Sequence, residues 1–74
     1  MALIRQIQEK EEHKRANIHG EVEATFVIFE KDGETYLQID TYGSPNRAEM
    51  KVSQSIQLGK EGRDALRTLL AKIE

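Results

Sequence analysis

The chain has 74 residues, a formal net charge of −2 and no cysteine. A domain this short has a small core, and without cysteine it has neither a disulfide nor a thiolate metal site to add stability, so we expect at least a dimer. The small negative charge argues against strong nonspecific attraction to a polyanion. No apolar run is long enough for a membrane span or a signal-peptide core, so we expect a cytoplasmic protein without membrane contact.

Residues 1–20 form a charged segment for which the sequence allows two structures. Leu3, Ile4 and Ile7 have the spacing of a short helical stripe, which does not continue beyond Ile7. The segment is therefore predicted to be a helix or, alternatively, a strand at residues 2–7 followed by a charged arm. Residues 21–74 are expected to form the single folded domain.

Residues 21–42 predict a β-hairpin. β-branched and aromatic residues concentrate in the first half of this stretch. Asp32-Gly33 favours a two-residue type I′ turn, because both central positions of that turn need positive φ, and the turn sets Lys31 opposite Glu34. Counting back from this pair gives the register Phe29–Tyr36, Ile28–Leu37, Val27–Gln38, Phe26–Ile39 and Ala24–Thr41.

Alternation of side chains along the strands divides the hairpin into two faces. We call the predicted core side the inner face; its residues are Ala24, Phe26, Ile28, Leu37, Ile39 and Thr41. The opposite side, the outer face, mixes rings with hydrogen-bonding groups; its residues are Val27, Phe29, Tyr36, Gln38, Asp40 and Tyr42.

A loop and a third strand follow the hairpin. Residues 43–49 contain the only proline and are predicted to be a loop. Side chains along residues 50–58 alternate between the two faces. The residues assigned to the inner face are Val52, Gln54, Ile56 and Leu58. The outer phase consists of Lys51, Ser53, Ser55 and Gln57. Because an amide on a core face must find hydrogen-bond partners, Gln54 is assigned to a subunit interface.

Residues 60–73 predict an amphipathic helix that begins after Gly59. Its apolar residues have the i, i+3, i+4, i+7 spacing of a helical stripe: Leu66, Leu69, Leu70 and Ile73. The helix should lie with this stripe against the sheet or against a partner helix.

Signals for catalysis or metal binding are weak. Asp40, a histidine and a serine could be written as a triad, but no local signature surrounds them. His13 and His19 lie in a segment that is better explained as solvated and charged than as a metal site. We therefore expect no catalytic residue, no metal and no cofactor, and we treat a small enzyme as the weakest alternative.

The outer face is the strongest candidate site. Rings on a sheet can stack bases, while Lys, Arg, Ser and Gln can bind phosphates and base edges. The candidate residues are Phe29, Tyr36, Gln38, Tyr42, Arg47, Lys51, Ser53, Ser55 and Gln57. The alternatives are an ordinary solvated face, whose aromatic residues merely suit strands, or a dimer surface.

The order of these elements resembles the core of the transcriptional positive-cofactor-four family, which is related in fold to the Whirly proteins. The resemblance rests on the hairpin EKDGETYLQIDTYG, the strand KVSQSIQL and the helix KEGRDALRTLLAKI, and it covers residues 24–74. It implies a curved antiparallel sheet, a following helix and a homodimer that binds single-stranded DNA. It also implies that residues 36–42 line the binding channel and that the helical stripe forms the dimer.

The sequence therefore predicts an α+β fold, with a curved antiparallel sheet of three to four strands and a C-terminal amphipathic helix. The expected function is non-enzymatic binding of single-stranded nucleic acid by a coactivator-like homodimer. The dimer interface is assigned to Gln54, Leu66, Leu69, Leu70 and Ile73. The alternative function is a protein-interaction or oligomerisation module that binds no nucleic acid.

Overall fold

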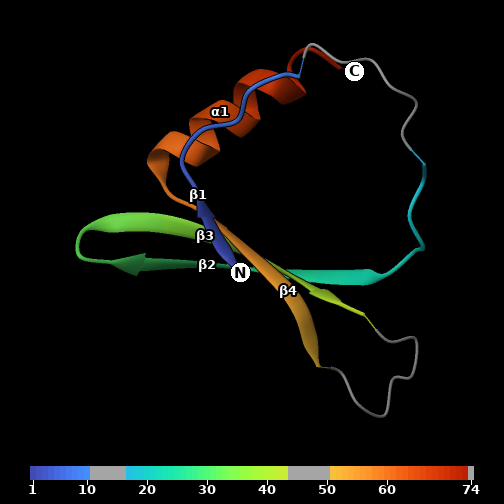
Figure 1. Cartoon of the computed structure of the whole chain (residues 1–74). Coiled ribbons are helices and arrows are strands. Elements are labelled where there is room, and N and C mark those ends of the chain that lie inside the picture. The colour runs from blue at the N-terminus through green and yellow to red at the C-terminus, as the bar shows by residue number, and fades with distance from the viewer. Residues whose placement is uncertain (11–16, 44–50, 74) are drawn as a thin grey trace.

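The computed structural model describes residues 1–10, 17–43 and 51–73 and has a small α+β fold (Figure 1). A four-stranded sheet is followed by one helix, and the elements are β1 (Ala2–Ile4), β2 (Glu23–Lys31), β3 (Glu34–Tyr42), β4 (Val52–Leu58) and α1 (Lys60–Leu70). The strands lie in the order β1-β4-β3-β2. The predicted fold class and the C-terminal helix are confirmed.

The sheet is mixed: the predicted antiparallel pairing is confirmed for β2, β3 and β4 and is wrong for β1. Strands β2, β3 and β4 pair antiparallel, but β1 pairs parallel with β4, with Ala2 opposite Ile56 and Ile4 opposite Leu58. A parallel pair needs a long connection between its strands. Here the connection from β1 to β4 includes β2 and β3. Sequence periodicity could not show this pairing, because three residues are too few to define a period.

The helical interpretation of the N-terminal segment is wrong for its described part. Only residues 2–4 form a strand, shorter than the alternative strand at 2–7, and residues 5–10 have no regular secondary structure. These residues run alongside α1 (Figure 1), where Glu9 lies 3.9 Å from Lys72. Both side chains are exposed, so this ion pair adds little stability.

The hairpin has the predicted register. Asp32 and Gly33 have positive φ values of 53° and 80°, as the type I′ turn requires. The observed pairs include Lys31–Glu34, Phe29–Tyr36, Ile28–Leu37, Val27–Gln38, Phe26–Ile39 and Ala24–Thr41. A local turn signal was sufficient here because a two-residue connection leaves the strands no freedom to slip.

A register shift in β4 corrects the assignment of one residue. Thr41 pairs with Gln54, but the next residue, Tyr42, pairs with Val52, so Ser53 is the extra residue of a bulge. Directly opposed residues share a face, which moves Val52 from the predicted inner face to the outer face beside Tyr42. Alternation counted along one strand cannot detect such an insertion.

The core lies where α1 meets the end of β4. Leu58 is 1% exposed. Gly62, in the first turn of α1, is buried against it. A Cβ atom at Gly62 would lie 2.3 Å from the carbonyl oxygen of Ile4 and 3.2 Å from Leu58 Cβ, so glycine permits this close contact between helix and sheet.

A carboxylate from the hairpin caps the N-terminus of α1. Gly59, at the N-cap, has no side chain to cap the helix. Instead, Glu34 Oε2 accepts a hydrogen bond of 2.9 Å from the backbone N–H of Lys60. A negative charge is favourable at this end of a helix. The helix ends at Leu70, earlier than predicted, and residues 71 and 72 form a turn.

Much of the inner face stays uncovered, because α1 contacts chiefly β3 and β4. Phe26 and Ile28 on β2 are 69% and 62% exposed. Along the predicted helix stripe, Leu66 and Leu69 are partly buried, whereas Leu70 and Ile73 are exposed. The sheet and the helix therefore present apolar surface that this single chain does not bury.

Candidate nucleic-acid interface

The outer face lies on the side of the sheet opposite to the Leu58 core. Pairing places Gln38 opposite Gln57 and Asp40 opposite Ser55, and it adds Leu3 of β1 beside Gln57. Residues from β1, β3 and β4 therefore meet on one surface. The strands hold these side chains at fixed cross-strand positions, so their mutual arrangement belongs to the sheet and not to a loop.

A chain of hydrogen bonds crosses the middle of this face. Gln57 Nε2 donates to Gln38 Oε1 at 2.8 Å, and Gln38 Nε2 donates to Asp40 Oδ1 at 3.0 Å. Ser55 Oγ donates to the same Asp40 oxygen. An ionised carboxylate only accepts hydrogen bonds, so Asp40 fixes the direction of the whole chain. Each amide must turn its NH₂ group toward Asp40.

Aromatic rings stand at both ends of β3. Phe29 and Tyr36 stack with their ring centroids 5.4 Å apart and their planes 21° apart. At the other end, the Tyr42 hydroxyl lies 2.9 Å from Thr25 Oγ1, within hydrogen-bond distance. Tyr36 and Tyr42 are six residues apart, which corresponds to about 20 Å along a strand.

A groove with a volume of about 450 Å³ runs over the hydrogen-bonded chain. Its polar lining is Gln38, Asp40, Ser55 and Gln57. Apolar atoms of Leu3 and Val52 belong to its walls, and Val52 is there because of the bulge. A pocket with apolar walls and a few convergent polar groups is the usual form of a small-molecule or base-binding site.

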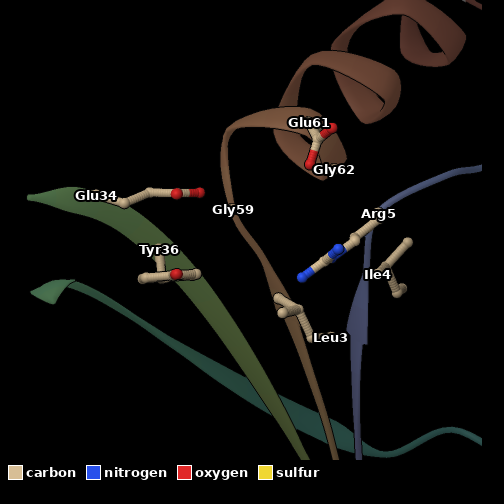
Figure 2. A pocket seen from close by; sticks show the side chains of 8 residues that line it. All are labelled: Leu3, Ile4, Arg5, Glu34, Tyr36, Gly59, Glu61 and Gly62. Atoms are coloured by element: carbon tan, nitrogen blue, oxygen red, sulfur yellow. The ribbon is translucent and has the colours of Figure 1, made fainter. Parts of the chain in front are cut away.

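A smaller pocket of about 70 Å³ lies at the Tyr36 end of the face, between β1, β3 and the start of α1 (Figure 2). Figure 2 shows the guanidinium of Arg5 directed into this pocket. Arg5 is exposed and has no hydrogen bond or ion pair among residues 1–10, 17–43 and 51–73. It places a cation beside Tyr36.

The structure brings together some of the predicted site residues and separates others. Gln38, Ser55 and Gln57 share the hydrogen-bonded chain, and Phe29 stacks on Tyr36. Lys51 is exposed immediately before β4, and Ser53 lies at the bulge, close to Gly43. Arg47 lies outside the described residues. Of the predicted interface residues, Gln54 is exposed opposite Thr41 on the inner face.

Three groups on this face were not among the predicted site residues. Asp40 is the acceptor at the centre of the chain, and the hairpin register together with the next strand could have indicated it, because both place polar residues around it. Thr25 could have been found from its position opposite Asp40. Arg5 had no sequence signal, since its position depends on the parallel pairing of β1.

The histidines and acids make no catalytic or metal-binding cluster in the described part of the chain. Asp40 is engaged by Gln38 and Ser55, and His19 is exposed outside the strands. His13 lies outside the described residues. Among the residues that the structure describes, no three His, Asp or Glu side chains lie close enough to hold a metal ion.

Comparison of the chain with protein-family models, with curated protein sequences and with solved structures gave no match. The single described helix, α1, is too short and too polar to cross a lipid bilayer. The geometry of the outer face is therefore the basis for a functional assignment.

Proposed function

We propose that this protein binds single-stranded nucleic acid, DNA in the first place, across its outer face. It would act without catalysis, as a cytoplasmic, coactivator-like homodimer of curved sheets similar to the positive-cofactor-four proteins. The observation that carries the proposal is the arrangement of rings at both ends of β3 with a polar groove between them. Single-strand binders use the same combination of stacking surfaces and hydrogen-bonding groups.

The charges on the face indicate how a strand would lie. Asp40 in the groove repels phosphates, so the bases rather than the backbone should face the sheet. Arg5 lies at the Tyr36 end and Lys51 precedes the strand that carries Val52, so a cation is available near each end of the groove. Phosphates would follow the rim, where these two side chains can neutralise them.

The exposed surface supports the dimer. Phe26, Ile28 and Ile73 are 69%, 62% and 67% exposed in the single chain. Large exposed apolar side chains of this kind mark an interaction surface. A second copy is the simplest partner, because it brings the same apolar inner face and makes a self-complementary interface possible.

The inner face of β2 would contribute to this interface through Phe26 and Ile28, next to the helix stripe assigned from the sequence. Light scattering should then give about twice the chain mass of 8.5 kDa. Leu69→Glu, which puts a charge into the stripe, should lower both assembly and stability. A well-folded monomeric wild type would contradict the dimer.

The test of nucleic-acid binding is a fluorescence polarisation titration with a labelled single-stranded DNA of about ten nucleotides and mixed sequence at low salt. Tyr36→Ala should weaken binding about tenfold or more, and Tyr36→Phe, which keeps the ring, should not. Lys51→Ala should weaken binding, while Lys72→Ala, after the C-terminal end of α1 and away from the outer face, is the matched control. No binding at high micromolar protein, or binding indifferent to both Tyr36→Ala and Lys51→Ala, would exclude this function.

A protein-interaction module is the second candidate, favoured by the exposure of Phe26 and Ile28. Large exposed apolar surface marks interaction sites on soluble domains. Affinity capture from nuclease-treated extract separates the two functions. This candidate would be favoured if a defined partner is captured, if Phe26→Ser abolishes its capture, and if the protein has no affinity for oligonucleotides.

A further inference from the structure

We propose that the groove over Asp40 selects bases that present hydrogen-bond donors, guanine foremost, and disfavours thymine. This inference rests on the proposed function, because it names the ligand that the same face prefers. It follows from the direction of the hydrogen bonds in the groove, which determines which atoms are left for a ligand.

The groups left over in the groove are two acceptors and the second N–H of each glutamine amide; the acceptor that carries a charge is on Asp40. Asp40 Oδ1 already accepts from Gln38 and Ser55, but no described group donates to its other oxygen, Oδ2. At the other end of the chain, Gln57 uses its NH₂ group toward Gln38, and its Oε1 accepts no hydrogen bond within the described residues. The carboxylate cannot change this, because it has no proton to donate.

A carboxylate oxygen that a ligand covers must be given a donor in place of water or remain poorly solvated. Guanine offers two adjacent donors, N1–H and the 2-amino group, on its Watson–Crick edge. Adenine and cytosine offer one exocyclic amine. Thymine offers a single N3–H between two carbonyl oxygens, and these oxygens would lie against the negative charge of Asp40.

Substitution of Asp40 by asparagine gives a sharp prediction. The new side chain can keep its carbonyl oxygen toward Gln38 and Ser55 and then presents NH₂ where Oδ2 stood. The acceptor at this position becomes a donor, so the preference for guanine should disappear or turn toward thymine. Asp32→Asn is the matched control: it removes the same charge, and Asn-Gly suits the type I′ turn as well as Asp-Gly does.

The experiment compares labelled thymidine oligonucleotides of about ten nucleotides that carry one central guanine, inosine or thymine. With wild-type protein we expect the guanine strand to bind about tenfold more tightly than the thymine strand, with inosine, which lacks the 2-amino group, between them. Asp40→Asn should bring the guanine-to-thymine ratio of dissociation constants to about one or below. Asp32→Asn should leave the ratio unchanged, although both variants bind all strands somewhat more tightly.

The outcomes separate this inference from the proposed function. Equal binding of the guanine and thymine strands by the wild type overturns the inference and leaves single-strand binding intact. An unchanged ratio in a folded Asp40→Asn variant also overturns it. If none of the strands binds, the inference and the proposed function both fail. The base series requires no variant, so it decides the question even if Asp40→Asn does not fold.

Discussion

The two faces of the sheet differ in how far a single chain meets their needs. On the outer face the need is for hydrogen-bond partners, and on the inner face it is for burial of apolar side chains. On the outer face, Gln38, Asp40, Ser55 and Gln57 supply one another's hydrogen bonds, and two rings stack. On the inner face, Leu58 is fully buried, but Phe26 remains largely exposed two strands away. The polar groups of the outer face thus have hydrogen-bond partners within the single chain. The inner face needs further apolar surface before its burial is complete.

The largest loss of stability is expected from a substitution in the buried part of the inner face. Leu58→Ala should lower the free energy of unfolding by about 2–5 kcal/mol, because it leaves a cavity between β4 and the first turn of α1. Denaturant unfolding followed by circular dichroism measures this change. A loss below about 1 kcal/mol would mean that the contact of Leu58 with Gly62 contributes little to the fold.

The next prediction tests the uncovered part of the inner face. Phe26→Ser should shift the protein from about 17 kDa toward the monomer mass in light scattering, because the dimer loses a large apolar side chain. Val27→Ser is the matched control, since it changes the neighbouring residue on the opposite face. If the protein is instead a monomer, Phe26→Ser should leave its mass unchanged and lower its stability only slightly, because the side chain is already 69% exposed.

On the outer face, Phe29→Ala should weaken binding of single-stranded DNA about threefold to tenfold. The change removes one ring of the stacked pair and leaves Tyr36 without the neighbour that orients it. Fluorescence polarisation at constant salt measures the affinity, and thermal unfolding checks that the sheet is intact. Unchanged affinity would mean that bases stack on Tyr36 and Tyr42 but not on Phe29.

The smallest effect is expected at the junction between the hairpin and the helix. Glu34→Ala should lower stability by about 1 kcal/mol, because Lys60 loses the carboxylate that accepts its backbone N–H. Glu30→Ala, an exposed glutamate in the same hairpin, is the control and should change stability by less than about 0.5 kcal/mol. Equal effects of both substitutions would contradict the capping role.

The features that the sequence predicted correctly are the local ones. Asp32-Gly33 determined the pairing of β2 with β3, and the spacing of Leu66 and Leu69 identified the helix. Each depends on residues close together in the chain, where turn geometry or helical period dictates the outcome. The outer-face residues Gln38, Ser55 and Gln57 were grouped correctly for the same reason, since alternation follows from strand geometry.

The features that were missed depend on contacts between distant residues. The bulge at Ser53 moved Val52 to the other face, and the parallel pairing of β1 brought Arg5 beside Tyr36. The central position of Asp40 appears only when two strands are placed in register. None of these has a signal in one segment, because each is set by a partner elsewhere in the sheet.

The pairing of β1 with β4 also constrains the order in which the chain assembles. Ala2 and Ile56 are about fifty residues apart, so their contact closes a long loop, and the entropy of that closure slows its formation. During synthesis β1 emerges first, yet it has no strand to pair with until β4 has been made. The hairpin can form earlier, with Leu58 and α1 following, and β1 would be the last strand to join the sheet.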